Sequence, residues 1–304
     1  MIVENELKEL LYASMPEKKQ CIDQIISSSG AQVLISADQA GFVLEAGSYG
    51  LIRFTSRAMK VLWTFGYAFE FAMSDYAGAI TYFKGSGQNF KFKELLNSAQ
   101  GVPYNCHYNE LITSINSLKQ LPSEDDYSWP NIIPKSSATR PIGDESGAFD
   151  LICLATAYVF LHELKHVQFS SQNNAPDSVL EEEFKCDEFA VNMLTDQISS
   201  YVAISHENAA EVKSKRSIGI ALATAFLFVL TPESSWDGSD SHPAVTKRLD
   251  DVSVQLNLSC DDNYWLYLAS FFIAHCYFKN IEIPEVPFLS YKELSQSVLG
   301  FLQQ

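Results

Sequence analysis

Short apolar runs near the N-terminus give way to long helical patterns further along the chain of 304 residues. Three β-type runs, at 31–36, 41–46 and 49–54, follow a first segment with helical character. Gly41 and the segment AGSYG supply turns between the runs, so the pattern predicts a small antiparallel sheet. The next segment, RAMKVLWTFGYAFEFAMSDY, carries aromatic side chains at helical spacing and predicts a long helix with a buried face.

The rest of the chain is helical in pattern apart from a few connecting segments. Predicted helices lie at 91–99, 108–119, 147–170, 177–196, 206–230, 242–256, 262–279 and 290–302. One small sheet among this many helices predicts an α+β fold that is mostly helical.

The segment 121–146 interrupts this pattern, because it holds four prolines and has little periodicity. It could separate an N-terminal α/β part, residues 1–120, from a helical part, residues 147–304. It could also be a loop on the surface of one domain formed by residues 1–304, which is the organisation we favour.

Composition narrows the classes of function. The formal net charge of −16 repels phosphate backbones, so nucleic-acid binding is not expected. The six cysteines are spread out and form no CxxC pair, which favours a reducing cytoplasm. The N-terminus has no basic segment followed by an apolar one, so no signal peptide is predicted.

Two apolar runs, 151–161 and 217–230, are both shorter than the roughly 17–25 residues that span a bilayer. We therefore predict buried helices and no transmembrane segment. The sequence KSKR before the second run leaves room for peripheral contact with a membrane surface.

The segment FLHELKHVQF at 160–169 carries the strongest chemical signal. His162 and His166 are four residues apart, so on a helix both imidazoles can reach one Zn²⁺ ion. Glu163 lies on the same side, one step round the helix, where it can act as a general base toward water on the metal. The strongly apolar residues before the motif predict a buried, rigid helix beneath it.

A second helical segment, SVLEEEFKCDEFAVNML, follows with several carboxylates. Glu183 is the candidate third zinc ligand. Asp187, one turn further on, is then placed to accept a hydrogen bond from a ligand histidine. Glu181 and Glu182 are expected only to complement the dipole of the helix N-terminus. Cys186 is expected to be a small packing residue, because a fourth protein ligand would close a catalytic site.

HELKH followed by EFKCD has the HExxH…ExxxD layout of gluzincin metallopeptidases, and the chain resembles the Lit family of phage-exclusion peptidases more closely. Further blocks that carry this resemblance are VLWTFGYAFEF, the SWP at 128–130, KRSIGIALATA and SHPAVTKRL. They fall in the family's order and spacing from about residue 30 onward. Lys165 departs from the wider pattern, in which a charge is unusual at that position.

The resemblance implies a zincin-like, minimal gluzincin core and a zinc endopeptidase that acts in abortive phage infection. It implies elongation factor Tu as the protein substrate, and a phage-derived peptide or protein as a further candidate partner. By the same resemblance His162, His166 and Glu183 hold the zinc, Glu163 is catalytic and Asp187 is their companion. The competing hypothesis is a zinc-binding sensor or regulatory protein of a phage-defence or prophage element that cuts nothing.

The sequence leaves the roles of two residues in the SHPAVTKRL block undecided. His242 could stabilise the oxyanion formed during hydrolysis, as a His-Pro element in related gluzincins suggests. Alternatively, His242 and Pro243 only begin a helix. Arg248 could pair with an acidic residue of the site, but we expect it to be solvated. The strands predicted at 31–54 could offer an edge on which an extended substrate pairs.

Overall fold

The structure, a computed structural model, describes residues 2–38, 41–47, 50–92, 105–143 and 145–303. In this part of the chain it is mostly helical with one small sheet near the N-terminus, so the predicted fold class is confirmed. The helix predicted at 91–99 falls almost entirely outside the described residues. The chain divides into two compact units, each assembled from separate segments. Unit 1 comprises residues 1–62, 121–127 and 140–257, and unit 2 comprises residues 63–120, 128–139 and 258–304.

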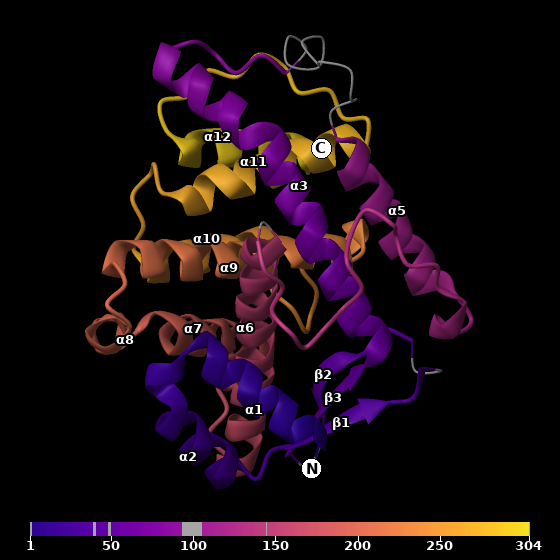
Figure 1. Cartoon of the computed structure of the whole chain (residues 1–304), viewed down its shortest axis with the longest axis vertical. Helices are drawn as coiled ribbons and strands as arrows, with labels where there is room; N and C mark the ends of the chain where they lie inside the picture. The colour runs from indigo at the N-terminus through magenta and orange to yellow at the C-terminus, as the bar shows by residue number, and fades with distance from the viewer. Residues whose placement is uncertain (1, 39–40, 48–49, 93–104, 144, 304) are drawn as a thin grey trace. The chain divides into compact units, whose positions relative to one another are not determined.

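Unit 1 holds the sheet and the helices with the candidate chemistry (Figure 1). Its helices are α1 (Ile2–Ser14), α2 (Lys19–Ser29), α6 (Glu145–Gln172), α7 (Val179–Thr195), α8 (Ile198–Ser205), α9 (Ala209–Leu230) and α10 (Val245–Leu256). Its strands are β1 (Gln32–Ser36), β2 (Leu44–Gly47) and β3 (Leu51–Thr55). Short 3-10 turns lie at Pro16–Lys18, Glu124–Asp126 and Glu233–Ser235. All residues proposed from the sequence for the site belong to this unit, whereas the assignment of the whole chain to one domain stays a prediction.

Unit 2 is helical. The long helix α3 (Ser56–Ser86) begins in unit 1 and continues into unit 2, which also holds α5 (Cys106–Gln120), α11 (Asn263–Phe278) and α12 (Tyr291–Leu302). The regularly spaced aromatic side chains of α3 contribute to the interior of unit 2. Phe65 and Phe69 of α3 both pack against Phe271 of α11. Ser290 caps the start of α12, because its side chain accepts the backbone N–H of Glu293.

The sheet is mixed, which corrects the prediction of an antiparallel sheet. Strand β3 lies in the middle, with β1 parallel to it on one edge and β2 antiparallel to it on the other. The prediction assumed that consecutive strands are neighbours in space. Here the chain passes from β1 to the far edge before it returns through β3, so only the short β2–β3 connection forms a hairpin.

Helix α6 is the centre of unit 1 and is buried on nearly all sides. It packs against α9, α7, β2 and β3. Gly219 allows α9 to approach α6 closely, because a Cβ at position 219 would lie 2.5 Å from the Cβ of Leu154 in α6. In length and hydropathy α6 would suffice to cross a membrane, but 72% of its most apolar window is buried within the protein.

Candidate metal centre and active site

The two histidines of the HELKH motif lie side by side on α6 and present their Nε2 atoms to one point. These atoms are 3.2 Å apart. The Nδ1 atom of His162 lies 2.9 Å from Asp187 Oδ1, and the Nδ1 atom of His166 lies 2.7 Å from Glu182 Oε1. A carboxylate at Nδ1 keeps the proton on that nitrogen, which leaves Nε2 free to bind a metal. Both rings are therefore oriented as ligands.

Helix α7 brings Glu183 to the same point. Its carboxylate oxygens lie 3.5 Å from His162 Nε2 and 3.3 Å from His166 Nε2. Ligand atoms at about 2.0–2.1 Å from a tetrahedral zinc ion are about 3.3–3.4 Å apart. The two imidazole nitrogens and this carboxylate thus have the spacing and the donor chemistry of a zinc site with three protein ligands.

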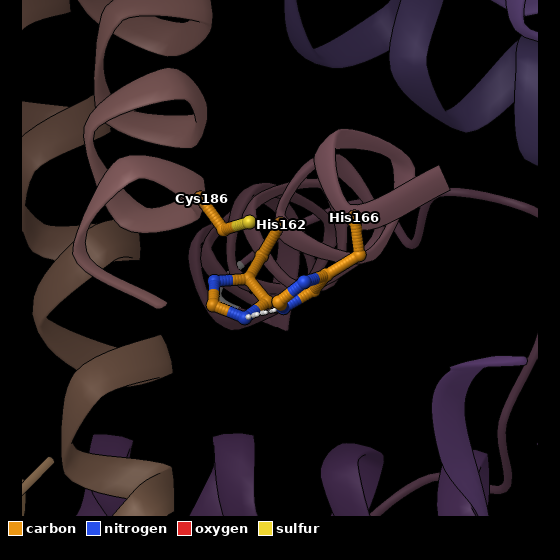
Figure 2. A group of neighbouring side chains, drawn as sticks. All are labelled: His162, His166 and Cys186. Carbon is orange, nitrogen blue, oxygen red and sulfur yellow. Dashed lines mark hydrogen bonds between the residues drawn. The ribbon is translucent and has the colours of Figure 1, made fainter. Parts of the chain in front are cut away.

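Cys186 lies on the same side of α7 as Glu183. His162, His166 and Cys186 form a group that could hold a metal ion, with ligand atoms within 4.8 Å of one another. Figure 2 shows the two imidazoles side by side and the sulfur of Cys186 directed toward them from the neighbouring helix. The Cys186 thiol is fully buried, and burial raises its pKa to about 12. This thiol must lose its proton before it can bind a metal, and the packing role of Cys186 stays a prediction.

Arg248 is buried and pairs with Asp187, so the expectation that it is solvated is wrong. Its Nε lies 2.8 Å from Asp187 Oδ2 and its Nη2 lies 2.7 Å from Asp187 Oδ1. Its Nη1 is 3.3 Å from Glu183, and the Tyr158 hydroxyl donates to Asp187 at 2.8 Å. Packing of α10 against α7 buries this side of α10. Asp187 therefore anchors His162 within a buried network of three donors.

The sequence contains a signal for the burial of Arg248. Val245, Leu249 and Val252 form the buried face of α10, and position 248 lies on the same face by helical spacing. A charged residue on such a face requires a buried partner. No sequence pattern indicates the contact of Glu182 with His166. Acidic residues at the start of α7 are expected in any case, because they complement the dipole of the helix.

The charges in the site shift the titration of its groups. Burial alone would lower the pKa of both imidazoles. However, Asp187 and Glu183 raise the pKa of His162 to about 9, and Glu183 and Glu182 raise that of His166 to about 9. Burial would raise the pKa of Glu183, but the two imidazoles hold it well below its usual range. In the same way, Arg248 and His162 hold the pKa of Asp187 low despite its burial.

Glu163 lies beside the two histidines but bonds to the sheet. Its Oε2 atom accepts the backbone N–H of Ala46 in β2 at 2.5 Å. Burial raises the pKa of its carboxyl, against the opposing influence of His162 and His166. A carboxylate whose pKa is raised above its usual range is better suited to accept and return a proton.

A cleft of ≈ 750 Å³ opens onto these groups. Its lining includes the ligand candidates, Glu163, strand β2, the C-terminal half of α9 and the segment that leads into α10. His242 is an exposed part of this lining, and its Nδ1 atom bonds with the Ser241 hydroxyl. Helix α10 begins only at Val245, so His242 and Pro243 do not form its first turn. The role of His242 in hydrolysis stays a prediction.

Lys165, the departure from the family pattern, does not reach the metal candidates. Its ammonium lies 4.2 Å from the centroid of the Phe169 ring and 5.4 Å from that of Phe189. These cation–π contacts explain how a half-buried charge is accommodated within the motif.

Comparison with known families decides the identity of the chain. A family model described as peptidase U49 matches residues 52–268. The chain belongs to the peptidase U49 family. The matched segment includes most of β3 and all of α6, α7, α9 and α10, and therefore every ligand candidate. This U49 peptidase is a Lit-type protease that acts on a protein substrate. No curated protein and no solved structure in the comparisons matches it.

The raised pKa values predict that Zn²⁺ added to this site would displace protons from the two imidazoles. At pH 7 imidazoles with pKa values of about 9 hold protons that Nε2 coordination must displace. Two imidazolium ions this close repel each other, so both are not fully protonated. We therefore expect the release of about one to two protons for each Zn²⁺ ion bound. Calorimetric titration with Zn²⁺ in Tris and in phosphate at pH 7 measures this number. Equal apparent enthalpies after correction for zinc–buffer binding would contradict the prediction.

The same shifts set how stability depends on pH. A histidine with a folded-state pKa above its ordinary value stabilises the metal-free protein below about pH 6.5, and this contribution is lost as pH rises through about 9. If Zn²⁺ occupies the site, the increase in Tm on its addition is therefore expected to grow between these pH values.

Proposed function

We propose that this U49 peptidase is a zinc-dependent endopeptidase with a zincin-like active site. The convergence of His162 Nε2, His166 Nε2 and the Glu183 carboxylate at separations of 3.2 to 3.5 Å carries this proposal. A zinc ion held there would polarise a water molecule and the carbonyl of the scissile bond. Glu163 would take a proton from the attacking water and deliver it to the leaving amine.

The surrounding residues have supporting roles in this mechanism. Asp187 and Glu182 fix the orientation of the two imidazoles through Nδ1. Arg248 compensates the buried charge of Asp187 and lies close to Glu183. His242, on the exposed lining of the cleft, is a candidate donor to the oxyanion.

The biological setting follows from the resemblance to Lit peptidases. We propose that the chain acts in the cytoplasm during abortive phage infection, with elongation factor Tu as its substrate and a phage-derived peptide or protein as its activator. The family match over residues 52–268 and the low cysteine density support this setting. A zinc-binding sensor that cuts nothing is the alternative, but it has no need of Glu163 in the cleft.

Proteomics of N-termini tests this function directly. Bacteria expressing the wild-type chain are compared with bacteria expressing Glu163→Gln, with and without phage infection. We expect new N-termini from one or few proteins only with the wild type. Identical N-termini in both strains under both conditions would favour the sensor.

Zinc affinity distinguishes Glu183 from Cys186 as the third ligand. We expect Glu183→Ala to weaken zinc binding by at least about 100-fold, because a direct ligand is lost. Cys186→Ala removes a buried sulfur and should change zinc affinity by less than about tenfold. Competition with a chromogenic chelator measures both. The reverse order of effects would indicate a His162, His166 and Cys186 site.

A further inference from the structure

Strand β2 is an edge of the sheet, and two of its residues present backbone groups outward. The β2–β3 register pairs Leu44 with Phe54 and Ala46 with Ile52. The Thr55 N–H donates to Val43 O, which makes Val43 and Thr55 a hydrogen-bonded pair. Such pairs alternate along an antiparallel ladder. The N–H and C=O groups of Leu44 and Ala46 therefore point away from β3, and both residues line the cleft.

Glu163 binds one of these outward groups. Its carboxylate accepts the Ala46 N–H although the two residues are 117 positions apart in the chain. An extended peptide that added to this edge would place its own carbonyl where the Glu163 oxygen now lies, because one N–H makes one strong hydrogen bond. The general base and an incoming strand thus compete for the same donor.

We propose that Ala46 is a positioning residue whose N–H holds Glu163 at the strand until an extended peptide pairs with β2. The inference rests on the proposed function of Glu163. Pairing transfers the Ala46 N–H to a substrate carbonyl and frees the carboxylate for proton transfer. The enzyme then favours extended substrates that reach the edge, and peptides too short to do so are cut slowly although they fit the cleft.

Removal of the Ala46 N–H should affect cleavage of long and short peptides in opposite ways, which tests the inference. Ala46→Pro deletes the donor at a sheet edge, where proline is tolerated. The substrates are a peptide of about ten residues that spans the cleavage site found by proteomics, and its central core of about four residues. In the wild type we expect kcat to be higher for the long peptide than for the core.

Ala46→Pro should raise kcat for the core peptide about two- to tenfold and raise KM for the long peptide by a similar factor. The ratio of the two kcat values then falls toward unity. Gln32→Pro places a proline on the opposite edge strand, away from the cleft, and should keep the wild-type ratio. Ala46→Gly retains the backbone N–H and should therefore show the wild-type ratio of the two kcat values. An unchanged ratio in Ala46→Pro would overturn the inference.

A measurement without proline or substrate tests the contact itself. Amide hydrogen exchange of ¹⁵N-alanine-labelled protein should be about tenfold faster at Ala46 in Glu163→Ala than in the wild type. Exchange at Ala58, which is buried at the start of α3, serves as the internal control. Unchanged exchange at Ala46 would refute the contact. Absence of all cleavage by the wild type, with the exchange difference present, would instead refute the proposed function.

Discussion

Glu163→Gln is expected to retain zinc and to lose peptide hydrolysis. Glutamine has the shape of glutamate, and its amide oxygen can still accept the Ala46 N–H. The ligand candidates His162, His166 and Glu183 are unchanged, so the metal content should stay at that of the wild type. Glutamine cannot accept the proton of the attacking water. We therefore expect kcat to fall by roughly 10²- to 10⁴-fold.

Metal analysis and kinetics on the same preparation make this test specific. His166→Ala is the matched control, because it removes a ligand candidate and should lose both zinc and activity. A Glu163→Gln enzyme that retains zinc but is inactive assigns the loss to the proton acceptor. Hydrolysis within about tenfold of the wild-type rate would show that another group accepts the proton.

Arg248→Met is expected to have the largest effect on stability. It leaves the Asp187 carboxylate, whose side chain is 1% exposed, without its only guanidinium partner among the described ion pairs. Breaking a buried pair from one side typically costs about 3–5 kcal/mol. Because Asp187 also orients His162, we expect zinc affinity to fall about 10- to 100-fold.

A second arginine of unit 1 provides a control with similar geometry and different burial. Arg140 makes the same two-atom contact to Asp150, at 2.7 and 2.9 Å, but its side chain is 56% exposed. Water screens this pair, so Arg140→Met should destabilise the protein far less and leave zinc binding unchanged. Urea unfolding of both variants, with and without zinc, measures the difference. Equal losses of stability would show that the Arg248 network contributes no more than a surface pair.

The sequence by itself determined the features that depend on local spacing. Two histidines four residues apart on a helix lie on one face in any fold, so His162 and His166 could be placed together without a structure. Glu183 and Asp187 followed in the same way from a second helical segment. The mostly helical class followed largely from length, because α6, α9 and α11 are mostly apolar over 28, 22 and 16 residues, which is longer than ordinary strands.

Only the tertiary structure decided the contacts between segments far apart in the chain. Nothing local indicates that β1 pairs parallel to β3, since strand order depends on where the chain crosses the sheet. Helical spacing places Arg248 on the buried face of α10, but its partner Asp187 lies 61 positions away on another helix, so the sequence does not identify the pair. The Ala46–Glu163 contact joins an edge strand to the motif helix by backbone geometry, which side-chain patterns do not encode. Local periodicity thus determines which side chains share a face, whereas helix and strand packing determines which faces meet.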